Sequence, residues 1–404
     1  MRTWLVIAVL TFGAVVSGAG CGGQSRGAAG MRGGAGEDSG SGSATGGASQ
    51  PAEGGSAGSS DEPEASAGAT ANPSSEACSG GVATIVPDTE PEAELGEFGC
   101  GADPAAKPVE TLATGRSTFD LAVAGDLLYF MEYSELPDTR GLIGRVPVGG
   151  GEVEYIARDL NGWAPMAVAG TSLFFNSNSG LAGLPLNGGT PEVIDPATSS
   201  LLATWDSRLY FTTGIPSSNS NTWAFKGYPS RDDAPSPELT LDDRIDVVTA
   251  LAANATVVYF TSYFGELGGV SMTTGEVRVF PKADYFPASS LAVNSTGVYY
   301  TAGTPEDRNR TVILKASLDG DERRIFARGG GGGDAKIAVD AEYVYFVDWN
   351  DGSPEPLACV KKKPLTGGAP TLVATWPNSY GFGLTIDETH VYFSDSNTIM
   401  RAPK

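Results

Sequence analysis

The sequence has very little histidine, few basic residues and no hydrophobic run long enough for a comfortable membrane span. A single histidine, His390, occurs among 404 residues, which excludes most histidine-based catalytic schemes and histidine-rich metal clusters. Lys and Arg number 26 against 48 Asp and Glu, so the net charge is −22. Phosphate backbones would be repelled by this charge, so no nucleic-acid partner is expected.

The first 20 residues have the pattern of an export signal. Arg2 precedes the short apolar run "WLVIAVLTFGAVV", and small residues then lead into Cys21. The stretch "SGAGC" resembles the lipobox of bacterial lipoproteins, although Gly18 stands where leucine is usual, so a plain cleaved signal is the alternative. The resemblance implies a lipid on Cys21 that anchors the protein to a membrane. Because Gly22 and not aspartate follows the cysteine, it also implies an outer-membrane lipoprotein facing the periplasm or the cell surface.

The segment after the signal has almost no large apolar residues. Residues 21–77 are mainly Gly, Ala and Ser with scattered acids, a composition that cannot offset the entropy of folding, so we predict a disordered tether. The alternative is a leader without a mechanical purpose. Only four cysteines occur in the chain. With Cys21 lipidated, Cys78 and Cys100 are predicted to form a disulfide in a lead-in segment, residues 78–108, which leaves Cys359 as an odd thiol.

One short strand pattern recurs through the rest of the chain. "LLYFME", "LFFNSN", "LYFTTG", "VYFTSY", "VYYTAG", "VYFVDW" and "HVYFSD" each contain a pair of adjacent aromatic residues. The second aromatics lie 36 to 49 residues apart, which is the period of a propeller blade. These second aromatics are Phe130, Phe175, Phe211, Phe260, Tyr300, Phe346 and Phe393.

Each repeat reads as four antiparallel strands joined by tight turns. Such a unit is too small to be stable alone and buries its aromatic faces only when another unit stacks on it. The last repeat ends at "TIMRAPK" without a fourth strand, whereas a spare strand, "VETLATG" (109–115), precedes the first repeat. We therefore predict an all-β protein in which residues 109–404 form a β-propeller of seven four-stranded blades, closed by the N-terminal strand. Six or eight blades stay open as alternatives because the third repeat is irregular.

The repeat also resembles known propellers. "VYFSD" followed by "TIMRAPK" is similar to the Tyr-Trp-Thr-Asp repeat of receptor propellers and to the TolB-like and NHL-type propellers. It is more similar still to exported propellers of myxobacterial type, in which "VYF" stretches recur. The Tyr-Trp-Thr-Asp propellers usually have six blades. The resemblance implies a fold and does not choose a function, because propellers carry many unrelated functions.

The side of the predicted ring that carries the long, varied loops is the candidate binding surface. We call it the loop face: it holds the loops that lead into each first strand and those that connect each second strand to the third. Exposed aromatics beside acids are typical of recognition surfaces, so we predict that this face binds a protein, a peptide or a glycan. The alternative is that the rings pack between blades. The predicted binding residues are Tyr133, Trp163, Tyr285, Trp349, Trp376 and Tyr380.

Catalysis is the competing function. A propeller lyase, hydrolase or cofactor-dependent dehydrogenase would gather ionisable side chains at the mouth of the central channel, and the first strands offer few: Asp120, Asp246, Asp334 and Lys336. No cofactor is expected. Calcium is the one metal considered, because "DWNDG" places the oxygens of Asp348, Asn350 and Asp351 close together. Solvated turn carboxylates are the alternative.

Overall fold

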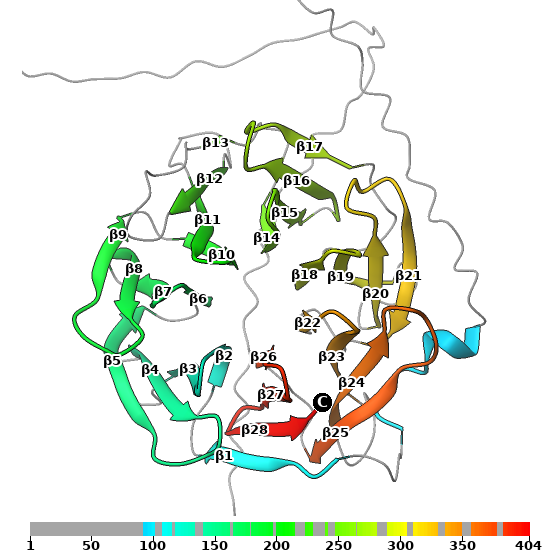
Figure 1. Cartoon of the computed structure of the whole chain (residues 1–404), viewed down its shortest axis with the longest axis horizontal. Helices are drawn as coiled ribbons and strands as arrows, with labels where there is room; N and C mark the ends of the chain where they lie inside the picture. Colours follow the sequence, from blue (N-terminus) through cyan, green and yellow to red (C-terminus); the bar gives the residue numbers. More distant parts are fainter. Residues whose placement is uncertain are drawn as a thin grey trace, which may run out of the picture. The chain divides into compact units, whose positions relative to one another are not determined.

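The computed structural model describes residues 92–101, 107–114, 118–133, 140–161, 165–177, 179–196, 199–214, 223–228, 239–240, 247–263, 265–280, 289–304, 310–329, 336–349, 357–377 and 383–404. The predicted signal peptide, the tether and the start of the lead-in lie outside these residues. The described residues of 107–404 form seven four-stranded antiparallel sheets arranged in a ring (Figure 1). The prediction of a seven-bladed, all-β propeller is confirmed.

The blades follow the sequence repeats in order. Blade 1 contains β2 (Thr118–Ala124), β3 (Leu127–Tyr133), β4 (Arg140–Pro147) and β5 (Glu154–Asn161); blade 2 contains β6 (Met166–Ala169), β7 (Ser172–Ser177), β8 (Gly180–Pro185) and β9 (Glu192–Asp195). Blade 3 contains β10 (Ser199–Trp205), β11 (Arg208–Gly214), β12 (Trp223–Tyr228) and β13 (Leu239–Thr240); blade 4 contains β14 (Val248–Ala253), β15 (Val257–Ser262), β16 (Leu267–Ser271) and β17 (Val277–Val279).

The remaining blades complete the ring. Blade 5 contains β18 (Leu291–Asn294), β19 (Gly297–Gly303), β20 (Thr311–Ala316) and β21 (Arg323–Arg328); blade 6 contains β22 (Ile337–Val339), β23 (Tyr343–Trp349), β24 (Leu357–Pro364) and β25 (Thr371–Pro377). Blade 7 contains β26 (Gly383–Ile386), β27 (His390–Ser394), β28 (Thr398–Pro403) and β1 (Glu110–Thr114), and a short 3₁₀ helix, η1 (Glu92–Leu95), precedes β1. The first strand of each blade lies at the centre of the ring (Figure 1).

The paired aromatics explain why one motif is repeated. Neighbouring residues of a strand point to opposite faces of its sheet, so the two rings of each pair reach the two neighbouring blades. In each of the seven hydrophobic clusters, the first aromatic of one blade lies with the second aromatic of the next. The pairs are Tyr129 with Phe175, Phe174 with Phe211, Tyr210 with Phe260, Tyr259 with Tyr300, Tyr299 with Phe346, Tyr345 with Phe393, and Tyr392 with Phe130. The last pair joins blade 7 to blade 1.

The N-terminal strand closes the ring as predicted. β1 pairs antiparallel with β28, and the register places Glu110 opposite Arg401 and Thr114 opposite Thr398. Arg401 also forms an ion pair of 2.6 Å with Glu110. The irregular third repeat forms a complete blade despite a fourth strand of only two residues, β13, so the alternatives of six and eight blades are excluded.

In blades 6 and 7, the turn between the first and second strands contains an aspartate that accepts a hydrogen bond from a tyrosine packed between two blades. Tyr392 donates its hydroxyl to Asp387 Oδ2 at 2.6 Å, and Tyr345 donates to Asp340 Oδ2 at 3.1 Å. Burial raises the pKa of Asp387, but the hydrogen bonds from Tyr392 and from the amides of Thr389 and His390 outweigh it, so the pKa lies below its usual range. The pKa of Asp340 is lowered in the same way. Burial raises this pKa, but the hydrogen bond from Lys404, the hydrogen bonds from two backbone amides and the charge of Lys404 together lower it by more.

Stability is therefore expected to fall in acid. A carboxylate with a lowered folded pKa stabilises the fold above its unfolded value of about 3.9, and this contribution is lost as the pH drops through the folded pKa. The Asp387→Asn variant should lose less of its unfolding free energy than the parent between pH 5 and pH 2, as measured by denaturant titration. The Glu388→Gln variant, altered at an exposed neighbour in the same turn, is the control. If Asp387→Asn lost as much unfolding free energy as the parent between pH 5 and pH 2, this aspartate would not contribute to the acid sensitivity.

Candidate functional site

The ends of the second strands place side chains at the loop face. The residue two positions after the second aromatic points to the same side of the blade as that aromatic, toward the preceding blade. In three consecutive blades this residue is an acid: Asp348 in blade 6, Asp395 in blade 7 and Glu132 in blade 1. All three are buried, with exposed fractions of 2%, 7% and 2%. Sequence reasoning missed this pattern, although the spacing from the aromatic pair would have revealed it.

Glu132 borders a small pocket at the junction between blade 7 and blade 1. We call it the seam pocket: it is small and partly open to solvent, and its lining includes Thr114, Thr118, Phe130, Glu132, Tyr155 and Asn397. Thr114 ends β1, Thr118 begins β2 and Asn397 precedes β28, so this part of the pocket lies at the loop face, whereas Val153 and Tyr155 line it from the start of β5. The Tyr155 hydroxyl donates to Glu132 Oε2 at 2.7 Å, and the Tyr155 ring packs edge-on against Phe130 with centroids 6.3 Å apart.

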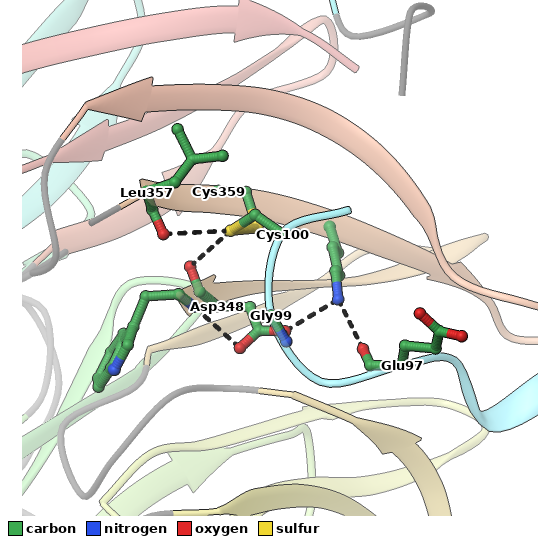
Figure 2. The surroundings of a disulfide bond; sticks show 8 residues. Glu97, Gly99, Cys100, Asp348, Leu357 and Cys359 are labelled. Atoms are coloured by element: carbon green, nitrogen blue, oxygen red, sulfur yellow. Dashed lines mark hydrogen bonds and ion pairs between the residues drawn. A yellow bond between two sulfur atoms is a disulfide. The ribbon is translucent and has the colours of Figure 1, made fainter. Parts of the chain in front are cut away.

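Asp348 has a structural role in a second cluster, which holds the lead-in segment against blade 6 (Figure 2). Its Oδ2 accepts hydrogen bonds from Lys361 Nζ and from the amide of Gly99, both at 2.9 Å. Lys361 Nζ also donates to the carbonyl of Glu97 at 2.8 Å. The Asp348 carboxylate is thus neutralised by a buried lysine. The predicted calcium site stays a prediction, because Asn350 and Asp351 lie outside the described residues.

The disulfide of this cluster differs from the predicted one. Cys100 is bonded to Cys359, with Cα atoms 5.8 Å apart, so the predicted bond between Cys78 and Cys100 is wrong, and Cys78 lies outside the described residues. The lead-in passes along β24 before it becomes the outer strand of blade 7, which brings Cys100 to Cys359 across 259 residues of sequence. We call residues 92–101 and this disulfide the lead-in clasp.

The clasp also gives a structural role to lysines of the basic run "VKKKP". Alternate residues of β24 point to one side, and there Lys361 and Lys363 reach the clasp. Lys363 Nζ donates to Phe326 O at 2.6 Å and to Glu94 O at 3.0 Å. An ion pair between Glu92 and Arg328 completes the attachment to blade 5. The clasp therefore spans the outer parts of blades 5 and 6.

The structure describes three of the six predicted aromatic binding residues. Trp376 is only 3% exposed and stacks on Phe393, with ring centroids 4.6 Å apart, in the core between blades 6 and 7. Its prediction as a binding residue is wrong, because β25 continues to Pro377 and carries the ring inward. Trp349 is half-buried at the end of β23, and Tyr133 is the last residue of β3. Trp163, Tyr285 and Tyr380 lie outside the described residues.

The candidates for catalysis at the centre of the ring are only partly described. Asp120 is half-buried on β2 and accepts hydrogen bonds from the amides of Leu121 at 3.1 Å and Met166 at 2.7 Å. Burial raises its pKa, although the charge of Lys336 and these two hydrogen bonds act against the rise. Met166 begins blade 2, so Asp120 ties two blades together. Asp246 and Asp334 lie outside the described residues.

A similar contact joins blades 5 and 6, where the amide of Ile337 donates to Ser290 Oγ at 3.1 Å. Asp120 is therefore one of at least two side chains that connect neighbouring blades near their first strands. His390 is a partly buried strand residue whose Nδ1 lies 2.8 Å from Thr389 Oγ1, as expected for an ordinary position of the repeat.

Neither a metal site nor a membrane helix is found in the part of the chain that the structure describes. No group of three or more His, Cys, Asp or Glu side chains is arranged there to hold a metal, and no cofactor is indicated. No helix within the described ranges has the length and apolarity needed to cross a membrane.

Comparison with known proteins identifies the fold. No protein-family model matches the chain, and no curated protein is significantly similar to it in sequence. The WD40 domain of Pan2 from Neurospora crassa is similar in structure, with a TM-score of 0.53 and 9% identity over 74% of this chain and 96% of that domain. U3-55K gives a TM-score of 0.52 and 14% identity over 75% of this chain and all of its own, and the WD40 repeats of RRP9 give 0.52 and 14% over 73% and 97%. At these identities the similarity shows the propeller fold alone.

Proposed function

We propose that this protein is an exported, lipid-anchored propeller that binds a protein, peptide or glycan partner through its loop face and does not itself catalyse a reaction. The seam pocket carries this proposal, because it combines a carboxylate, two aromatic rings and polar side chains at an open position on that face. The signal pattern, Cys21 and the Gly- and Ser-rich segment support export to the cell envelope and a membrane anchor.

An enzyme with its site at the centre of the ring is the second candidate. The raised pKa of Asp120 and the nearby charge of Lys336 favour it, since perturbed carboxylates are common in active sites. Both Asp120 oxygens nevertheless accept backbone hydrogen bonds, and one of those bonds holds blade 1 to blade 2. A structural role accounts for this residue, so we place binding first.

The proposal can be tested by asking which face a ligand covers. The full chain would be immobilised and used to select from a displayed library of random 12-residue peptides, and the bound peptides would be located by hydrogen exchange. We expect slower exchange at the loop-face ends of the strands, for example around Thr118 and Asn397. Protection confined to the opposite face, around Asp126 and Asp387, or recovery of no binding peptide, would overturn the proposal.

A further inference from the structure

The disulfide of the lead-in clasp lies between the N-terminal segment of the chain and the strand that closes the ring. Cys100 is bonded to Cys359 of β24 (Figure 2), and β1 (Glu110–Thr114) follows Cys100 in the sequence. Every residue before the clasp, including Cys21, is therefore connected to β1 only through Cys100. A force applied to the N-terminal side of the chain reaches the disulfide before it reaches β1.

β1 is poorly suited to resist such a force. It is the edge strand of blade 7 and pairs with β28, in a register that is interrupted between Thr111 and Ala113. Its buried residue, Leu112, belongs to the cluster that joins blade 7 to blade 1. A strand pulled from one end breaks its hydrogen bonds in succession, and segments with few buried contacts open first. Separation of β1 would therefore open the ring at its closure.

β24, by contrast, is held on both sides. It pairs with β23 and with β25 in blade 6, and Cys359 lies opposite Asp348 in one neighbour and Thr375 in the other. Cys359 is completely buried, as are Ala358 and Val360 on either side of it. A force that arrives at Cys359 pulls on the middle of this strand, so its hydrogen bonds to both neighbours must break together.

The other contacts of the clasp lie before Cys100 in the chain and are weaker. An ion pair joins Glu92 to Arg328, but 78% of the Glu92 side chain is exposed, and exposed pairs contribute little. The lysines of β24 donate hydrogen bonds to the carbonyls of Glu94 and Glu97. Without the disulfide, a force that broke these contacts would pass directly to β1.

We propose, on the basis of the membrane anchor inferred above, that the Cys100–Cys359 disulfide is a mechanical stop that keeps tension on the N-terminal segment from reaching β1. An anchored protein that holds a partner through its loop face is pulled whenever the partner moves relative to the membrane. The stop transfers this force to blade 6, and β1 stays paired with β28. The ring therefore remains closed while the protein is under tension.

Single-molecule force measurements on the disulfide-bonded full chain test the stop. One handle is attached at Thr273, which is exposed in the turn between β16 and β17. The second is attached either at Gly22 or at Pro108, an exposed residue between Cys100 and β1. Pulling from Pro108 bypasses the disulfide, so we expect β1 to separate in an early step at low force. Pulling from Gly22 should unfold the ring without this early step.

Removal of the disulfide provides the second comparison. In Cys100→Ala/Cys359→Ala, pulling from Gly22 should produce an early step that the parent lacks and that frees up to about 50 Å, the extended length of residues 101–114. Glu92→Gln removes only the exposed ion pair with Arg328 and should behave as the parent does. If the double variant does not fold, the comparison of Gly22 with Pro108 in the parent still decides.

Two results would overturn the stop. One is the same early step, at the same force, in the parent and the double variant pulled from Gly22, because tension would then reach β1 despite the disulfide. The other is the absence of an early step on pulling from Pro108, because β1 would then need no protection. Either result would leave the membrane anchor and the binding function standing.

The anchor is tested separately, by mass spectrometry of the N-terminal peptide from a membrane fraction. A lipid on Cys21 is expected. An unmodified Cys21 would overturn the anchor and leave the force measurements unchanged, so failure of the stop and failure of the proposed function are distinguishable.

Discussion

Replacing Cys100 and Cys359 together by alanine is expected to lower the free energy of unfolding by about 3–5 kcal/mol. The disulfide joins residues that are 259 positions apart, and a cross-link across so long a loop removes much of the entropy of the unfolded chain. Both cysteines are also buried, Cys359 completely, so part of the loss reflects packing. Denaturant titration of the parent and the double variant measures the difference.

The same variant distinguishes the clasp from ring closure. β1 pairs with β28 through backbone hydrogen bonds that do not involve the disulfide, so the ring should stay closed while residues 92–101 become more accessible. We expect faster hydrogen exchange in the clasp and unchanged exchange in β28. The parent protein treated with a reductant should approach the behaviour of the variant. An equal unfolding midpoint for parent and variant would show that the disulfide adds nothing to stability.

The architecture was predictable because one physical requirement is repeated seven times. A strand with two adjacent large aromatics must bury rings on both faces, and only a blade with a neighbour on each side can do so. The requirement survives in the irregular third repeat, where Tyr210 and Phe211 still contact blades 4 and 2 although β13 has only two residues. The last repeat lacks a fourth strand and a spare strand precedes the first repeat. The sequence therefore also predicted that the N-terminal strand closes the ring.

The disulfide and the seam pocket could not be predicted in the same way, since each depends on contacts between distant segments. Cys100 and Cys359 meet because the lead-in crosses blade 6, and no local pattern in the sequence indicates that path. Glu132 lines a pocket whose other wall, Thr114 and Asn397, comes from the two ends of the propeller. Trp376 was misplaced for a local reason, because β25 extends further than its sequence suggests and buries a ring that was assigned to a loop.

Asp348→Ala is expected to destabilise the protein by about 3–5 kcal/mol, more than removing its whole ion pair. Lys361 is mostly buried beside Asp348, with 10% of its side chain exposed. The single variant therefore leaves a positive charge in the interior that keeps its hydrogen bond to the Glu97 carbonyl but loses its counter-charge. The amide of Gly99 also loses its acceptor. The double variant Asp348→Leu/Lys361→Met removes both charges and fills the space, so its loss should be smaller than that of Asp348→Ala.

A surface pair provides the matched control. Asp321 and Arg278 form an ion pair of similar length, 3.0 Å, but more than half of each side chain is exposed. Asp321→Ala should therefore change the unfolding free energy by less than about 1 kcal/mol, because exposed pairs contribute little. If Asp348→Ala cost no more than Asp321→Ala in denaturant titration, the clasp would not depend on its buried charge. If the double variant cost more than the single one, the ion pair would itself be net stabilising, since well-packed apolar side chains could not replace it.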